Sequence, residues 1–231
     1  MSTGSGLPNR PLTITADMLA PPPESRLDFE RGMRYTAPVT LVLVIACIVA
    51  FCWQVTSGGL ESLEALVDSG ALVRDGLVDG EAWRLLSSMF LHGGIEHLVG
   101  NMLALYVLGI GCEHAFGSAT MAGLYMAAGV AGGLATAAVE PAPTVGASGA
   151  IFGLMGCLVA VLQRLRRTVH VRDRRIGGVI AVWAAWQLAL GFASPFVANF
   201  AHLGGFVAGA ALGFCVPPRA AFRTPPEAAP A

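Results

Sequence analysis

A serine and a histidine lie within apolar stretches of this sequence that are long enough to cross a lipid bilayer. Ser148 stands in the segment 146–149 (GASG), and His202 follows the segment 199–201 (NFA). A reactive or ionisable side chain is costly in hydrocarbon, so residues of this kind usually have a function. A serine hydroxyl becomes a nucleophile when a histidine accepts its proton. The pair therefore predicts serine hydrolase chemistry inside a membrane.

The composition indicates a membrane protein. Of the 231 residues, 55% are hydrophobic and only 13% are charged, and the mean hydropathy is +0.65. A soluble domain averages roughly 25% charged residues. Apolar runs, each close to the roughly 20 residues that span a bilayer, occupy residues 39–55, 95–112, 119–139, 145–163, 176–193 and 196–216. We expect an all-α membrane protein with six transmembrane helices, although polar residues dilute the start of the second run and a count of five remains open.

The arginines predict the orientation of these helices. All 14 basic residues are arginines, and they concentrate before the first run, between the fourth and fifth runs, and after the sixth. Because basic residues in short loops collect on the cytoplasmic side, both termini are expected to be cytoplasmic. Residues 1–34 are interpreted as a disordered tail, 35–216 as the helical domain, and 217–231 as a tail rich in proline and alanine. Arginine without lysine favours a GC-rich bacterial genome, and thus a bacterial plasma membrane.

In this orientation the second, fourth and sixth helices begin at the outer surface. His97, Ser148 and His202 each fall a few residues into one of these helices. With a rise of 1.5 Å per residue, they would share a layer about 5 to 10 Å below that surface. The common depth predicts that the three side chains belong to one site.

Small residues predict which helices pack closely. In membranes, stripes of small residues let two backbones approach each other. The sixth helix carries such a stripe on the face of His202, and the fourth helix carries one near Ser148: Gly205, Gly209 and Gly213, and Gly149, Gly153 and Gly156. We expect these two helices to form a tight pair that brings Ser148 towards His202.

The second helix offers hydrogen-bond donors for an oxyanion. His97 and Asn101 are four residues apart and so share one helix face. Together with the backbone N–H of Ser148, they are candidates to stabilise the negative charge that forms when a serine attacks an amide, an effect of roughly 3 to 4 kcal/mol per donor. No aspartate lies in any predicted span, and the nearby glutamates stand at helix ends. A Ser-His dyad is therefore predicted.

These residues resemble the motifs of the rhomboid family of intramembrane serine proteases, over about residues 35–215. The resemblance rests on a Gly-x-Ser-Gly motif that opens the fourth helix, a His-x-x-x-Asn motif in the second, and an Ala-His pair followed by small residues in the sixth. A Trp-Arg pair in the first loop and a glutamate after the second helix also fit. The residues concerned are Gly146, Ser148, Gly149, His97, Asn101, Ala201, His202, Gly205, Gly209, Trp83, Arg84 and Glu113.

The resemblance implies a six-helix rhomboid-like bundle in which Ser148 is the nucleophile and His202 the general base and acid. It implies an oxyanion hole made of His97, Asn101 and the Ser148 amide. Phe152 would stack under the His202 ring, at a position where many family members carry tyrosine. The implied substrates are single-pass transmembrane proteins in the lipid bilayer, cut after a small residue, with no cofactor, metal or nucleic acid. Supporting roles are expected for Gly146, Gly149, Phe152, Asn199, Trp83, Arg84 and Glu113.

Other classes of membrane protein fit the sequence less well. A His-Glu-x-x-His metalloprotease motif and a pair of buried aspartates are both missing from the sequence. A catalytically silent rhomboid-like protein that binds transmembrane clients is the main alternative. Such proteins typically lose the serine or the histidine, and both are present here, so this interpretation ranks second. A small transporter is a third interpretation. For Trp83-Arg84, two compatible interpretations stand: an anchor at the membrane interface, or a brace that holds the first loop against the active-site helices. His92 is interpreted as a loop residue at the entrance.

Overall fold

The computed structural model describes residues 36–165, 171–192 and 197–219. Within these residues the protein is all-helical, apart from one isolated bridge between Leu72 and Thr144. This confirms the predicted fold class. The tail predicted at residues 1–34 and most of the one predicted at 217–231 lie outside the described residues. The helices are α3 (Pro38–Thr56), α4 (Leu63–Asp68), α5 (Arg74–Val78), α6 (Arg84–Ser87), α7 (Ile95–Phe116), α8 (Ser118–Val139), α9 (Ser148–Arg164), α10 (Val171–Phe192) and α11 (Asn199–Cys215).

The six long helices lie where the six apolar runs predicted them. Of the described helices, α3, α7 and α8 are both long enough and apolar enough to cross a membrane, and α9 and α11 are shorter apolar helices. Less than half of the apolar stretch of each of the first three is buried inside the protein, with only 28% for α3. Large apolar side chains such as Val42, Ile45 and Val49 therefore face outwards. A lipid environment accounts for this outer surface, since soluble proteins rarely expose apolar patches of this size.

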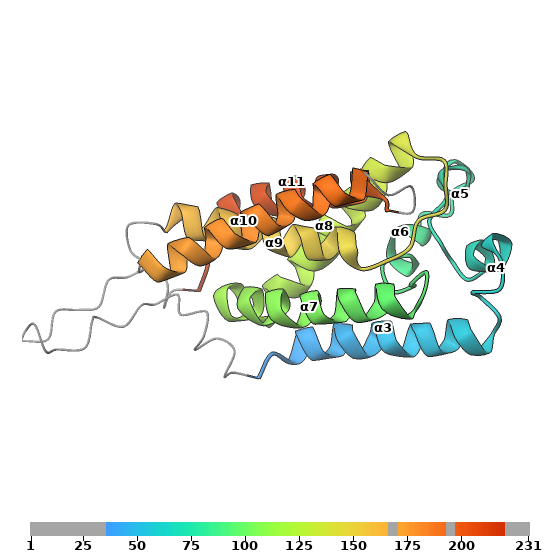
Figure 1. Ribbon diagram of the computed structural model, residues 1–231, viewed down its shortest axis with the longest axis horizontal. Helices are drawn as coiled ribbons and strands as arrows, with labels where there is room; N and C mark the ends of the chain where they lie inside the picture. The colour runs from blue at the N-terminus through green and yellow to red at the C-terminus, as the bar shows by residue number, and fades with distance from the viewer. Residues whose placement is uncertain (1–35, 166–170, 193–196, 220–231) are drawn as a thin grey trace, which may run out of the picture.

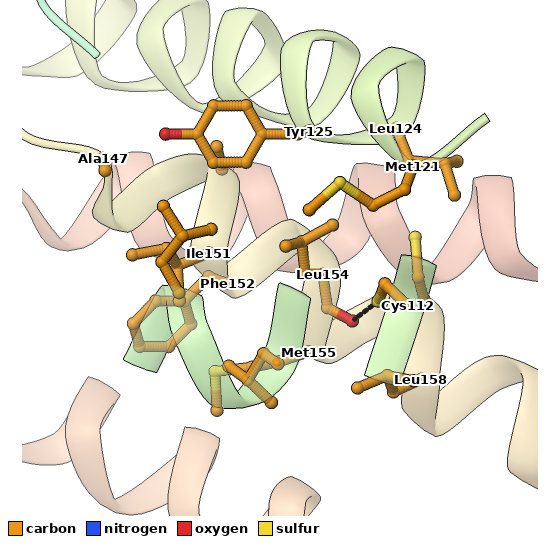
Figure 2. Packing of buried hydrophobic residues seen from close by; sticks show 14 of the residues in the cluster. Cys112, Met121, Leu124, Tyr125, Ala147, Ile151, Phe152, Leu154, Met155 and Leu158 are labelled. Atoms are coloured by element: carbon orange, nitrogen blue, oxygen red, sulfur yellow. Dashed lines mark hydrogen bonds between the residues drawn. The ribbon is translucent and has the colours of Figure 1, made fainter. Parts of the chain in front are cut away.

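Helix α9 lies at the centre of the bundle and packs against α7, α8, α10 and α11. Its side chains Leu154, Met155 and Leu158 are almost completely buried. Figure 2 shows this core, in which α9 meets residues of the surrounding helices such as Tyr125 of α8 and Cys112 of α7. Burial on all sides explains why this helix is apolar around its whole circumference.

Glycines let α11 approach the backbone of α9 closely. A Cβ atom added at Gly205 would collide with the carbonyl oxygen of Gly149, and one added at Gly209 would collide with that of Gly153. On the other helix, a Cβ at Gly156 would meet the carbonyl of Phe206. The predicted tight pair of helices is thereby confirmed, and the contact is backbone on backbone.

The segment between α3 and α7 forms a folded unit at one end of the bundle. It contains α4, α5 and α6, and Figure 1 shows these helices at the end opposite to the start of α3 and the end of α11. Helices α7, α9 and α11 all begin on the side nearer to this unit. Residues near the N-terminal ends of these three helices therefore share one level of the bundle.

We predict that Gly209→Ala destabilises the protein while Gly123→Ala does not. The first change places a methyl group on the Gly153 carbonyl, whereas the second lies on α8 with nothing within 4 Å of the added atom. Overpacking of this kind costs about 1 to 3 kcal/mol. Reversible unfolding in mixed detergent micelles measures the difference. Equal stability of the two variants would contradict the close packing of α9 on α11.

Candidate active site

Ser148 is the first residue of α9 and follows a sharp backbone turn. Gly146 has a φ of +126°, a conformation that favours glycine. A Cβ there would also lie only 2.7 Å from Cε1 and 2.9 Å from Nε2 of His97. Because Ser148 opens the helix, its backbone N–H has no acceptor within α9 and is available for a ligand.

The Ser148 hydroxyl lies beside the His202 imidazole. Ser148 Oγ and His202 Nε2 are 2.8 Å apart, which is hydrogen-bonding distance. The His202 ring lies parallel to the Phe152 ring at 4.3 Å between centroids, with 6° between the planes. This is the ring contact expected of Phe152, and it fixes the plane of the imidazole. His202 Nδ1 is buried and has no hydrogen-bond partner among the described residues, so no third carboxylate joins the pair there.

Asn101 and His97 place donor groups beside the same turn. Asn101 is buried, and its Nδ2 atom lies 3.5 Å from the position of a Cβ at Gly146. That Nδ2 atom has no hydrogen-bond partner within the described part of the chain. His97 is the most exposed of the set, and its Nδ1 atom lies 3.5 Å from the backbone nitrogen of Gly93. Two donor side chains and the start of α9 thus converge on one point.

Asn199 connects the histidine helix to its neighbour. It is the first residue of α11, is buried, and donates a hydrogen bond from Nδ2 to the Leu188 carbonyl of α10 at 2.9 Å. Asn199 stands three residues before His202, so this bond fixes the start of the helix that carries the imidazole. The geometry gives a concrete basis for the supporting role expected of Asn199.

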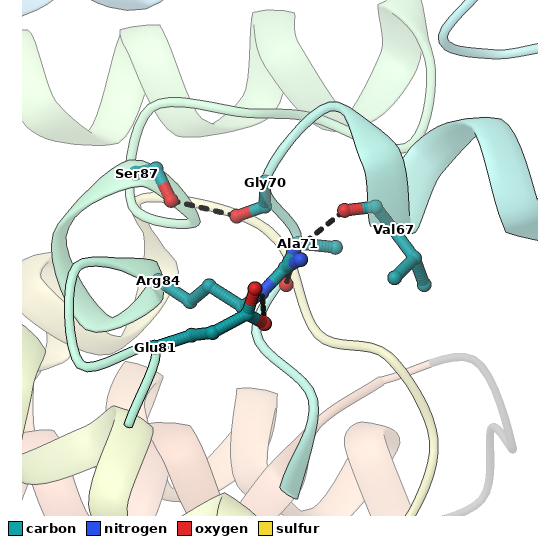
Figure 3. A network of polar contacts seen from close by, with 6 residues as sticks. All are labelled: Val67, Gly70, Ala71, Glu81, Arg84 and Ser87. Carbon is teal, nitrogen blue, oxygen red and sulfur yellow. Dashed lines mark hydrogen bonds and ion pairs between the residues drawn. The ribbon is translucent and has the colours of Figure 1, made fainter. Parts of the chain in front are cut away.

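Arg84 holds together the folded unit between α3 and α7 (Figure 3). Its side chain is buried, and Nη1 donates to the carbonyls of Val67 at 2.6 Å and Ala71 at 3.0 Å. Nε donates to the Glu81 carboxylate at 2.6 Å, and the guanidinium lies 4.6 Å from the Trp83 ring centroid. The Arg84 guanidinium is therefore engaged inside the loop, while the half-exposed Trp83 is free to meet the membrane interface.

The same unit supports the backbone that leads into Ser148. Leu72 and Thr144 exchange two backbone hydrogen bonds, at 3.0 and 2.9 Å, and Gly146 donates its N–H to the Ser88 carbonyl at 2.9 Å. A small cleft opens between these segments and α8, and its lining includes Ser88, Gly129 and Ser148. The loop thus braces the turn beneath the candidate nucleophile.

Glu113 lies away from this site. It stands near the end of α7, whereas His97 and Asn101 stand near its beginning. Its buried carboxylate accepts hydrogen bonds from the backbone N–H groups of Val39 and Thr40, and from the hydroxyls of Thr40 and Ser118. Glu113 therefore caps the start of α3 from a neighbouring helix. Any support it gives to the site is through the scaffold.

Gln54 and the environment of His92 were not predicted. His92 is a loop residue, as expected, but it is fully buried, and its backbone is hydrogen-bonded on both sides to the Gln54 side chain of α3. Burial, together with the nearby His97, lowers the pKa of His92 to about 4, so the ring is neutral at physiological pH. The signal in the sequence was a glutamine within an apolar run, because an intramembrane polar side chain needs a partner.

The sequence pattern of the Rhomboid domain matches residues 79–219. This match covers more than half of the chain, so the protein belongs to the rhomboid family, and it is an integral membrane protein. The matched region contains the Ser148–His202 pair, the donors of α7, and Arg84 with Glu81, whereas the Val67 and Ala71 carbonyls that Arg84 binds precede it. It also includes Arg219, whose N–H donates to the Ala115 carbonyl at 2.9 Å, so the first residues of the predicted C-terminal tail pack on the bundle.

The similar proteins include one that is named a protease and one that is named inactive. Rhomboid protease GluP of Bacillus subtilis is 38% identical over 170 residues, which cover 74% of this chain and 33% of GluP. RHOMBOID-like protein 5 of Arabidopsis thaliana is 37% identical, over 66% of this chain and 50% of the relative. Inactive RHOMBOID-like protein 8 of Arabidopsis thaliana is 34% identical, over 55% of this chain and 36% of the relative. The chain spans a third to a half of the length of these relatives, and family membership alone does not decide activity.

We predict that Arg84→Ala destabilises the unit between α3 and α7. The change removes bonds to two carbonyls and a carboxylate, and bonds to charged groups contribute about 1.5 to 3 kcal/mol each. Unfolding in mixed micelles should show a loss of roughly 2 to 4 kcal/mol. Asp79→Ala, at an exposed position in the same unit, is the matched control and should change little. An Arg84→Ala protein as stable as this control would refute the bracing role.

Proposed function

We propose that this protein is an intramembrane serine endopeptidase that works through a Ser148–His202 dyad. The observation that carries the proposal is the 2.8 Å distance between Ser148 Oγ and His202 Nε2. Its setting adds support, since the stacked Phe152 ring holds the imidazole in place and an unpaired donor, Asn101 Nδ2, lies beside the turn that leads into Ser148.

The proposed mechanism gives each of these groups a role. His202 Nε2 accepts the Ser148 proton as Oγ attacks the carbonyl carbon of the scissile peptide. The resulting oxyanion accepts hydrogen bonds from the Ser148 N–H, the Asn101 side chain and His97. His202 then protonates the leaving amine, and water hydrolyses the acyl-enzyme with His202 again as the base.

The proposed substrates are single-pass transmembrane proteins. An intact helix hides its carbonyls in hydrogen bonds, so the substrate must unwind locally, which favours helix-breaking residues near the cut. The cleft beside Ser148 is small and is lined by glycines among other residues. This fits the expectation of a small residue just before the cleaved bond.

The proposed topology places both termini in the cytoplasm and the dyad near the outer surface, with residues 35–216 as the catalytic domain. The arginine distribution supports this orientation. The bacterial plasma membrane stays a prediction, because the relatives named above come from a bacterium and from a plant.

A catalytically silent client-binding protein is the second candidate. The similarity to Inactive RHOMBOID-like protein 8 is the observation that favours it. Against it stand the presence of both dyad residues and their hydrogen-bonding distance.

We predict that purified protein in liposomes cleaves a single-pass transmembrane substrate. Ser148→Ala and His202→Ala should each lower the rate by at least about 10³-fold, because removing one member of a catalytic unit costs about as much as removing the whole unit. A gel that resolves the fragments measures this. Ser57→Ala, at an exposed position at the end of α3, is the control and should cleave normally. If the protein shows no cleavage and a fluorophosphonate does not label Ser148, the protease proposal is refuted and the silent protein is favoured.

We predict that Asn101→Ala lowers kcat about 100-fold with little change in KM, because an oxyanion donor acts mainly on the transition state. Steady-state kinetics in liposomes separate the two constants. A rise in KM alone would assign Asn101 to substrate binding.

A further inference from the structure

Gln54 is a fully buried polar side chain at the end of the buried stripe of α3. Its amide pairs with the peptide groups of a single residue in another segment. Oε1 accepts a hydrogen bond from the His92 N–H at 2.9 Å, and Nε2 donates one to the His92 carbonyl at 3.3 Å. Gln54 therefore fixes both peptide groups of His92, in the turn that leads into α7.

The His92 ring fixes this turn from within. Its Nδ1 atom lies 3.2 Å from the Phe90 carbonyl oxygen, and because a carbonyl only accepts, Nδ1 carries the proton. The ring then meets the His97 ring edge to face, with 5.2 Å between the centroids and 67° between the planes. The turn is thus held by Gln54 on one side and contacts His97 on the other.

The residue after His92 contacts His97 directly. The Gly93 N–H points to His97 Nδ1 at 3.5 Å, a long hydrogen bond in which Nδ1 is the acceptor. A neutral imidazole with an acceptor Nδ1 carries its proton on Nε2. Nε2 is on the edge of the ring that faces Gly146, two residues before Ser148. His97 is the most exposed residue of the site, so packing alone does not hold its ring in this orientation.

We propose that Gln54 is a positioning residue for the reaction: through the His92–Gly93 backbone, it holds His97 with Nε2–H directed at the oxyanion. The inference rests on the proposed function for its catalytic consequence. Gln54 itself touches neither Ser148 nor His202 among the contacts described above. It acts on the direction and the tautomer of one donor, and through these on the transition state.

A double-mutant cycle tests the route of this effect. Gln54→Met keeps the length of the side chain and removes the amide, and we expect kcat to fall about tenfold with KM within about twofold, since a loosened donor loses part of its effect on the transition state. In a His97→Ala background the same change should lower kcat no further. If the two effects multiply, or if Gln54→Met leaves kcat unchanged, the inference is overturned.

Two further variants separate positioning from general damage. Thr56→Val removes a hydroxyl that bonds only within α3, and it should behave as wild type. Gln54→Glu keeps an acceptor for the His92 N–H, and it should retain more activity than Gln54→Met. Equal losses in the two Gln54 variants would contradict the role of this bond.

A spectroscopic measurement keeps the inference testable whatever the activity. Nitrogen-15 NMR of labelled histidine distinguishes a protonated ring nitrogen from an unprotonated one. In wild type we expect the proton of His97 on Nε2, and in Gln54→Met a mixture of tautomers. An unchanged His97 pattern overturns the inference. If wild type does not cleave the substrate but the His97 tautomer changes as expected in Gln54→Met, the proposed protease function is overturned. The positioning of His97 by Gln54 is then still supported.

Discussion

The backbone contact between α9 and α11 is the constraint on which the site depends. Lipid tails are as apolar as the helices, so no hydrophobic force drives the two helices together, and close packing must supply the attraction. Gly205 and Gly209 make this possible because each faces a carbonyl of α9 with no side chain between. The same approach brings His202 of α11 to hydrogen-bonding distance of Ser148 at the start of α9. A methyl group at the contact would separate the helices and with them the dyad.

Several buried polar groups of this apolar bundle are paired with groups in other segments of the chain. Glu113 of α7 receives the first N–H groups of α3, Arg84 binds carbonyls of its own loop, and Gln54 of α3 binds the turn before α7. Without water, an unpaired polar group costs several kcal/mol, so each of these pairs also fixes a relative position. The pairing therefore determines geometry, and the turn before Ser148 inherits that geometry from the loop that braces it.

Features set by local composition were predictable, and features set by long-range pairing were not. Apolar runs gave the six long helices, and glycine stripes gave the contact of α9 with α11, because both follow from spacing along one chain. The common depth of His97, Ser148 and His202 followed from helix starts alone. The pairing of Gln54 with His92 spans 38 residues, and that of Glu113 with Thr40 spans 73. No periodicity encodes such partners, so the sequence does not predict that Glu113 binds the start of α3.

Some buried polar atoms in the described residues remain unpaired, and two of them, Asn101 Nδ2 and His202 Nδ1, are at the site. An unpaired buried donor costs about 1 to 3 kcal/mol in the resting protein. An oxyanion beside Ser148 would give the Asn101 amide the partner that it lacks, so this interaction would form as the reaction proceeds. Interactions stronger in the transition state than in the ground state are those that accelerate a reaction. Stacking on Phe152 restrains the His202 ring, and Nε2, which lies 2.8 Å from Ser148 Oγ, is the nitrogen placed to accept the serine proton.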